Sequence, residues 1–126
     1  MPGADPDRVV VWRAGEAVLA LPVESVIEVA EPGGDGRVRS RAGPLEPMDL
    51  PGLPPDAPRW AVVVRARRGA VALAADSVEG VTGAGPVESA PGWLGPMARD
   101  HLRGLVRLTD GRIAAVPALE DLPTSS

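Results

Sequence analysis

The chain consists of short, valine-rich apolar runs that glycine, proline and aspartate interrupt at close intervals. No run carries the pattern of a long amphipathic helix, which argues against a helical bundle or a coiled coil. Runs of about four to eight residues between turn-forming residues are typical of β-strands. The sequence therefore predicts roughly eight to ten short strands, arranged as a small barrel or a pair of barrels.

Three pairs of apolar runs are joined by turn sequences, which is the pattern of a β-hairpin. Gly15 lies in the first turn and Gly69 in the second, and Asp110-Gly111 in the third turn is the strongest signal. The three hairpins join Val9–Trp12 to Val18–Leu21, Trp60–Arg67 to Ala70–Ala75, and Gly104–Leu108 to Arg112–Val116.

A further strand is predicted at Ser25–Val29. Side chains alternate between the two faces of a strand. We therefore expect Val26 and Glu28 to face one side and Ile27 and Val29 to face the other.

Helix signals are weak, and only one or two short helical turns are expected, at Pro96–Arg103 and Pro117–Leu122. Two stretches dense in proline and glycine, Glu31–Gly36 and Pro51–Pro58, predict irregular structure. The second stretch has two interpretations. It is favoured as an ordered connector, and the alternative is a polyproline II segment that an aromatic groove recognises.

The core must be built from valine, alanine and leucine, because the chain has no Phe or Tyr and only Trp12, Trp60 and Trp93 are aromatic. A formal net charge of −4 argues against nucleic acid as a partner, since nucleic-acid binding depends on a basic face. Residues 1–58 carry ten acidic residues and five arginines, whereas residues 59–126 carry seven acidic residues and eight arginines. A solvated surface is the favoured explanation, and an acidic half that meets a basic partner stays open.

The absence of cysteine excludes a disulfide framework, a thiolate nucleophile and a zinc ribbon. The N-terminal segment MPGADPDR lacks the apolar stretch of a signal peptide. The longest apolar runs are far too short to span a bilayer. We therefore expect a cytoplasmic protein without membrane insertion.

No catalytic or cofactor constellation is found. The single histidine, His101, adjoins Asp100, but neighbours in sequence point in different directions, and no G-x-S-x-G elbow is present. One histidine and scattered carboxylates offer no metal site. The glycines of 33–36 and 80–85 lack the strand and helix that flank a phosphate-binding loop. The acidic pairs Glu28/Glu31 and Asp76/Glu79 are interpreted as a solvated face. We expect no enzymatic activity and no cofactor.

Five phrases follow one another along nearly the whole chain. They are Val9–Trp12, the stretch ALPVESVIEV at 20–29, Pro47–Leu50, Ala72–Val81, and His101–Leu105 with Asp110–Arg112 and Leu119–Leu122. In this order they resemble the CheW family of chemotaxis coupling proteins, with its phrases A-L-P, V-x-E-V, P-V-I-D-L and V-D-x-V. Each phrase is weak alone, but five in order are specific.

The resemblance implies an all-β fold of two small, intertwined, five-stranded SH3-like barrels with a hydrophobic groove between them. It covers a single domain over 1–126, with approximate subdomains 8–58 and 59–122. The implied function is to couple the cytoplasmic hairpin of a chemoreceptor to the regulatory domain of a CheA-type histidine kinase.

One segment departs from the family pattern. Ser40-Arg41-Ala42-Gly43 stands where the family has N-L-R-G, so Ala42 occupies the arginine position and Arg41 is one step away. On a strand that shift reverses the direction of the side chain. We therefore expect a first barrel that is trimmed, by up to one strand, and an altered partner interface.

The resemblance implies partner-binding roles for a set of residues near the groove: Val26, Glu28, Arg41, Leu102, Gly104 and Leu105. Val26 has a plain core position as an open alternative. Gly104 would permit a close backbone approach. Asp76 matches an aspartate of the family, with a hydrogen bond at a strand end as its favoured interpretation. Trp93 has no family counterpart and is either a binding anchor or a cap on a barrel.

Three functions follow. The first is an adaptor that couples chemoreceptors to the kinase. The second is a modulator or cap that binds only receptor or only kinase. The third is a small β-barrel that binds peptides outside chemotaxis. Self-association through an open strand edge is a further expectation.

Overall fold

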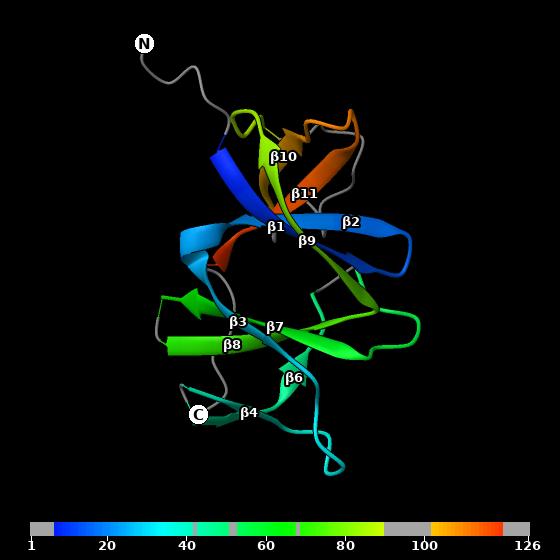
Figure 1. The fold of residues 1–126 in the computed structure, drawn as a ribbon, viewed down its shortest axis with the longest axis vertical. Coiled ribbons are helices and arrows are strands. Elements are labelled where there is room, and N and C mark those ends of the chain that lie inside the picture. The colour runs from blue at the N-terminus through cyan, green and yellow to red at the C-terminus, as the bar shows by residue number, and fades with distance from the viewer. Residues whose placement is uncertain (1–6, 42, 51–52, 68, 90–101, 120–126) are drawn as a thin grey trace.

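The computed structural model describes residues 7–41, 43–50, 53–67, 69–89 and 102–119, and nearly all of its regular structure is β (Figure 1). The strands of sheet A are β1 (Asp7–Ala14), β2 (Ala17–Pro22), β9 (Ser77–Ala84), β10 (Leu102–Arg107) and β11 (Ile113–Pro117). Those of sheet B are β3 (Val26–Ala30), β6 (Pro47–Met48), β7 (Trp60–Ala66) and β8 (Gly69–Ala75). A separate hairpin contains β4 (Val38–Ser40) and β5 (Gly43–Leu45), and the 3₁₀ turn η1 (Val23–Ser25) joins β2 to β3. The predicted all-β class is confirmed.

The three predicted hairpins all form. β1 pairs antiparallel with β2, β7 with β8, and β10 with β11. The turn between β1 and β2 places Gly15 at φ +61°, a left-handed conformation that glycine adopts without steric cost. These elements were predictable because each depends on residues close in sequence.

Sheet A has the order β10-β11-β2-β1-β9, so strands from both ends of the chain lie side by side. β11 and β2 are parallel and share one pair, Ala115 with Leu19. Isolated bridges connect the outer strands, between Ala84 and Leu108 and between Glu88 and Leu105. The sheet therefore curls until its edges meet, but the contact is made by single bridges and not by a continuous ladder.

Sheet B has the order β3-β7-β8-β6 and stays open. β6 has only two residues, and one of them is Pro47, which has no N–H to extend the ladder. The expectation of two barrels is corrected here, because neither sheet closes by continuous strand pairing among the described residues. The shortened segment forms β4 and β5 as a separate hairpin, and sheet B has four strands, one fewer than the five-stranded barrel of the resemblance, in line with the expected trimming.

The alternation predicted for the third strand is wrong at one point. Val26 is opposite Val64 and Glu28 is opposite Val63, so a β-bulge at Ile27 takes up one residue of β3. Cross-strand partners point to the same face, and Val63 and Val64 point to opposite faces. Val26 and Glu28 therefore lie on opposite sides of sheet B.

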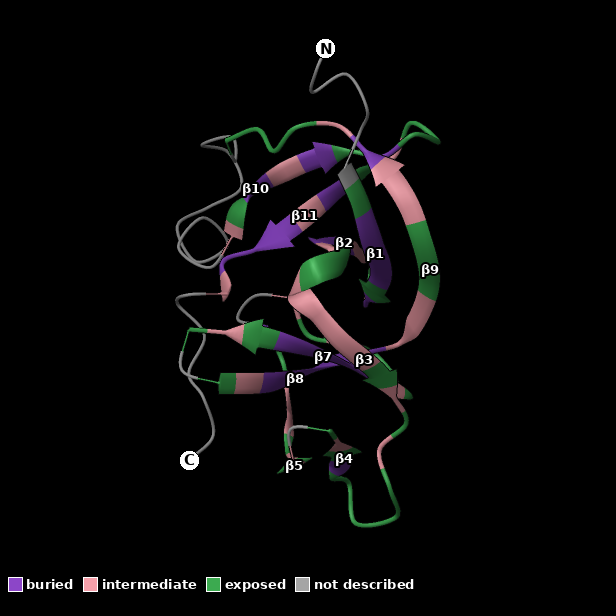
Figure 2. Cartoon of the chain, turned by 60° about the vertical axis from the view of Figure 1, so that its left-hand side comes forward, coloured by how far each residue is buried: buried purple, intermediate pink, exposed green. Residues whose placement is uncertain are grey.

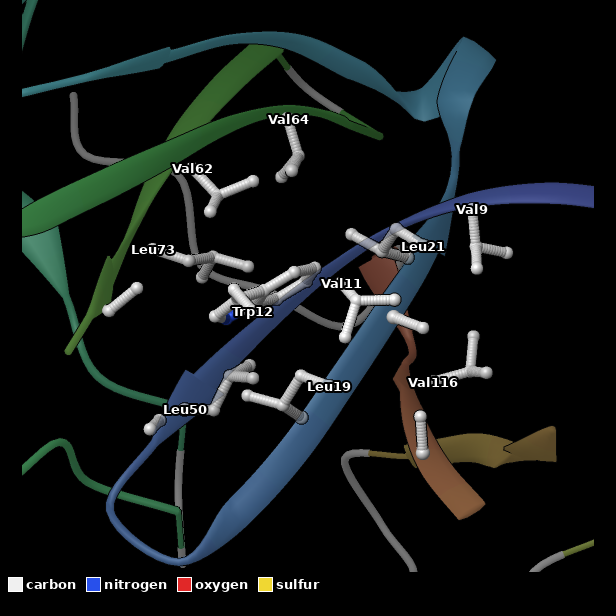
Figure 3. Close-up of a cluster of buried hydrophobic side chains, with 14 of the residues drawn as sticks. Val9, Val11, Trp12, Leu19, Leu21, Leu50, Val62, Val64, Leu73 and Val116 are labelled. Atoms are coloured by element: carbon white, nitrogen blue, oxygen red, sulfur yellow. The ribbon is translucent and has the colours of Figure 1, made fainter. Parts of the chain in front are cut away.

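The main core lies between the two sheets (Figure 3). Trp12 and Leu19 of sheet A pack in the same cluster as Val62, Val64 and Leu73 of sheet B, and all five are almost fully buried. A smaller cluster of Val38, Ala61, Val63 and Ala72 holds the β4–β5 hairpin against the other face of sheet B. Burial decreases from these clusters toward the loops (Figure 2).

Of the two predicted helical turns, Pro96–Arg103 lies mostly outside the described residues, and its last two residues begin β10. Pro117 ends β11, and 120–122 lie outside the described residues. The position of η1 at Val23–Ser25 was not predicted.

Candidate functional site

Two of the candidate residues lie on β3 and have different environments. Val26 is half-buried and packs against the main core. Glu28, on the other face, accepts a hydrogen bond at Oε1 from the backbone N–H of Arg41, at 2.8 Å. The core interpretation of Val26 therefore has direct support, and Glu28 holds the tip of the β4–β5 hairpin.

Arg41 lies in the turn between β4 and β5 and not on a strand, which corrects the sequence-based expectation. Ser40 pairs with Gly43 across the hairpin, and the Ser40 hydroxyl donates to the Gly43 carbonyl at 2.9 Å. Gly43 has φ +105°, which is why glycine follows this turn. The side chain of Arg41 is exposed, and only its backbone meets Glu28.

The other three candidates lie on β10, at the edge of sheet A. Leu102 and Leu105 are half-buried and Gly104 is buried. A Cβ atom at Gly104 would collide with the carbonyl oxygen of Glu88 and lie 2.8 Å from Cγ1 of Val87. The close backbone approach predicted for Gly104 is therefore present, and it admits the segment that bridges the edges of the sheet.

The six candidates thus fall into two groups. Glu28 and Arg41 meet through a hydrogen bond, and Val26 lies on the same strand as Glu28 but on the opposite face of the sheet. Leu102, Gly104 and Leu105 form the second group on β10. Their roles in partner binding stay predictions.

The structure adds a second candidate, which consists of three exposed valines on η1, β3 and β9. We call Val23, Val29 and Val81 the valine margin. Their exposed fractions are 39%, 38% and 53%, which is high for large apolar side chains. Val23 lies on η1, Val29 on β3 and Val81 on β9, the strand along the right-hand edge of the molecule in Figure 2.

The strand registers show which way two of these side chains point. Val29 is opposite Val62, a residue of the main core, so it lies on the face of sheet B that packs against sheet A. Val81 is opposite Val10, which in turn is opposite the core residue Leu21. Val29 therefore continues the face of sheet B that packs against sheet A, and both valines lie on terminal strands of their sheets.

Sequence reasoning missed the valine margin because valine on a strand predicts burial. The bulge in β3 is what brings Val29 to the same face as Val26. Val81 is exposed because β9 is the last strand of sheet A. Neither cause is local, so the sequence carries no direct signal for the exposure.

Asp76, between β8 and β9, connects three segments. Its carboxylate accepts hydrogen bonds from the backbone N–H of Gly15 at 2.6 Å, Asp56 at 3.0 Å and Ala57 at 2.5 Å. These donors, Asp56 first, hold the pKa of Asp76 below its ordinary value, against the opposing effect of desolvation. The favoured strand-end interpretation of Asp76 is supported, and residues 53–58 are bound as an ordered connector.

An exposed ion-pair group links β9 to the turn before β11. Arg112 contacts the Glu79 carboxylate with two nitrogens, at 2.6 and 3.0 Å, and Asp110 with Nε at 3.0 Å. The hydrogen bond from Arg112 lowers the pKa of Glu79 and also that of Asp110. Glu79 is thus occupied by a structural ion pair and is not poised for acid–base chemistry.

Within the described residues, no three potential ligand side chains gather in a way that could hold a metal ion. No helix in that part of the chain is long and apolar enough to cross a membrane. His101 and Trp93 lie outside the described residues.

Neither models of known protein families nor curated protein sequences match this chain. Among solved structures, the fold is similar to the crystal structure of the scaffolding protein TtCheW from Thermoanaerobacter tengcongensis, with a TM-score of 0.73. The two chains are 18% identical, and the similarity covers 91% of this chain and 86% of that chain. The chain therefore has a CheW-like fold, as the order of its motifs predicted.

Proposed function

We propose that this protein is a non-catalytic adaptor that couples chemoreceptors to a CheA-type histidine kinase in a bacterial chemosensory complex. The fold supports the proposal, and the observation that carries it is the valine margin. Exposed apolar side chains on the terminal strands of rigid sheets are suited to receive an amphipathic helix. A helical receptor hairpin would place its apolar side chains against Val29 and Val81.

The partner surface is proposed to be small and apolar at its centre. Valine loses little side-chain entropy when it becomes buried, so little of the free energy gained by burying its apolar surface is offset by lost side-chain freedom. Burial of apolar area contributes about 25 cal/mol per Å² before the costs of association. We therefore expect modest affinity for a single hairpin.

The proposal is tested by adding a charge to the margin. Val29→Arg and Val81→Arg are expected to weaken binding of a receptor cytoplasmic hairpin at least tenfold in titration calorimetry, because an arginine in an apolar contact has to lose its water. Val29 and Val81 are partly exposed, so the fold should survive, and circular dichroism checks this.

Ile113→Arg is the matched control. Ile113 is 55% exposed and lies on β11, which pairs with β10 and β2 and not with β9; its neighbour Arg112 reaches β9 only through the side chain of Glu79. It should change binding by less than twofold. Val26→Arg is a poorer probe, since Val26 packs against the core and its loss would also destabilise the fold. Equal effects of the margin variants and Ile113→Arg would sink the proposal.

A modulator that binds only one partner is the second candidate. The observation that favours it is the position of Arg41, which lies on a hairpin turn where the family resemblance predicts a strand. Titration into a receptor–kinase complex separates the two functions. A coupler raises kinase activity, whereas a cap lowers it or leaves it unchanged.

A further inference from the structure

The β4–β5 hairpin carries a basic face that the proposed function does not use. Arg37, Arg39 and Arg41 occupy alternate positions and are all exposed, whereas Val38 between the first two is fully buried in the smaller core cluster. Val38 anchors the hairpin, so the arginines on either side of it point away from sheet B. In Figure 1 this hairpin lies at the end of the molecule remote from sheet A.

These arginines are only weakly neutralised. Arg37 lies 3.7 Å from Glu46, and both side chains are more than half exposed, a geometry that contributes little to stability. Among the described residues, no carboxylate lies within 4.0 Å of the guanidinium of Arg39 or Arg41. Arg39 and Arg41 thus place two positive charges on one short hairpin, in the half of the chain that is rich in acidic residues.

A pocket of about 380 Å³ adjoins the basic face. Its lining includes Arg37 and Arg39, the backbone of Gly43, and Pro44, which is opposite Arg39 in the hairpin. Asp35 is the acidic residue of the lining, and its Oδ1 accepts the backbone N–H of Arg37 at 3.0 Å. The pocket therefore offers two guanidinium groups beside one carboxylate, that of Asp35, which already accepts a backbone hydrogen bond.

We propose that this face binds an extended, acidic segment of a partner protein. Alternate residues of an extended chain are about 6.6–6.8 Å apart, so carboxylates at every second position of such a segment match the spacing of Arg37 and Arg39, which flank the buried Val38 at the start of the hairpin. Arginine forms bidentate pairs with carboxylates, which adds geometric specificity. β4 and β5 pair only with each other among the described strands, so each also leaves a backbone edge open to an added strand.

The overall charge of the chain sharpens the inference. At a net charge of −4 the protein repels an acidic segment at long range, so binding requires a local basic site. The face is distinct from the valine margin and calls for a partner of different chemistry.

The test uses fluorescence anisotropy of a labelled nine-residue peptide with glutamate at alternate positions and threonine between, at low salt. The wild-type protein should bind it. R37E/R39E should weaken binding at least tenfold. R65E/R67E is the matched control, because Arg65 and Arg67 are exposed, have the same spacing and give the same change in net charge. It should change binding by less than twofold.

A peptide of the same composition with its glutamates contiguous should bind several-fold more weakly, and added salt should weaken the alternating peptide. NMR shift mapping on the wild-type protein should place the perturbed amides within 35–44, which tests the site even if R37E/R39E folds poorly. The proposal is overturned if the wild-type protein does not bind the alternating peptide, or if both double variants lose binding equally. It is also overturned if the contiguous peptide binds equally well, or if inorganic phosphate displaces the peptide at a concentration that supplies the same total negative charge. Receptor binding by R37E/R39E should stay intact, which keeps this test separate from that of the valine margin.

Discussion

Replacing Gly104 by alanine probes the contact that joins the two edges of sheet A. A Cβ at this position would collide with the carbonyl oxygen of Glu88 and lie 3.1 Å from its carbonyl carbon. Backbone cannot rotate away as a flexible side chain can, so the segment around Glu88 must move. Two backbone hydrogen bonds connect that segment to β10, Glu88 N to Leu105 O at 2.7 Å and Leu105 N to Glu88 O at 2.8 Å.

The magnitude follows from those two bonds. Each contributes about 0.5–1.5 kcal/mol net, so losing both costs about 1–3 kcal/mol. Alanine restricts the unfolded chain relative to glycine and returns about 0.4–1 kcal/mol. We expect Gly104→Ala to reduce the free energy of unfolding by about 1–2 kcal/mol, which lowers the melting temperature by several degrees in a chain of this size.

Gly85→Ala is the control in the same region. A Cβ there meets its first neighbour, the carbonyl oxygen of Arg107, at 3.9 Å, an ordinary contact. This variant should match or slightly exceed the wild type in urea unfolding. Hydrogen exchange at the amides of Glu88 and Leu105 should accelerate in Gly104→Ala alone. If Gly104→Ala is as stable as Gly85→Ala and keeps that protection, the close approach at Gly104 is not what holds the edge.

Three further predictions concern the hydrogen bonds to Asp76, the core and the surface ion pairs. The pKa of Asp76 is lowered in the folded protein, so the ionised carboxylate stabilises the fold above about pH 3.8, and this stabilisation is lost as the pH falls through the folded pKa. Asp76→Asn should therefore have a lower melting temperature than the wild type at pH 7, and the difference should shrink in acid. The buried Nε1 of Trp12 has no hydrogen-bond partner in the described part of the chain, so Trp12→Phe removes a donor that is left unsatisfied. In chemical unfolding, Trp12→Phe should therefore lose clearly less unfolding free energy than the roughly 3–5 kcal/mol expected for Trp12→Ala. Arg112→Ala should lower stability at low salt, and thermal melts at about 1 M salt should show a smaller difference, because its pairs with Glu79 and Asp110 are exposed and screened.

The hairpins could be predicted because their turns are local. Gly15 and Asp110-Gly111 are sufficient to place two of them, and the observed registers agree. The order of motifs also led to the correct fold, although each motif alone is weak. Gly104 was predicted to allow a close approach, and its neighbour proved to be Glu88.

Features set by distant segments escaped the sequence. The bulge in β3 depends on pairing with β7, and it separates Val26 from Glu28. The turn at Arg41 follows β4, which ends at Ser40, and β4 is held against sheet B by the buried Val38. The exposure of Val81 depends on β9 being the last strand of sheet A. Each is decided by tertiary packing and not by the residue types alone.

Side-by-side binding of the purified protein to a receptor cytoplasmic hairpin and to the regulatory domain of a CheA-type kinase tests the adaptor proposal most directly. The proposal predicts that both bind, and that Val29→Arg weakens receptor binding at least tenfold while Ile113→Arg changes it by less than twofold. A protein that folds as described yet binds neither partner contradicts the chemosensory role.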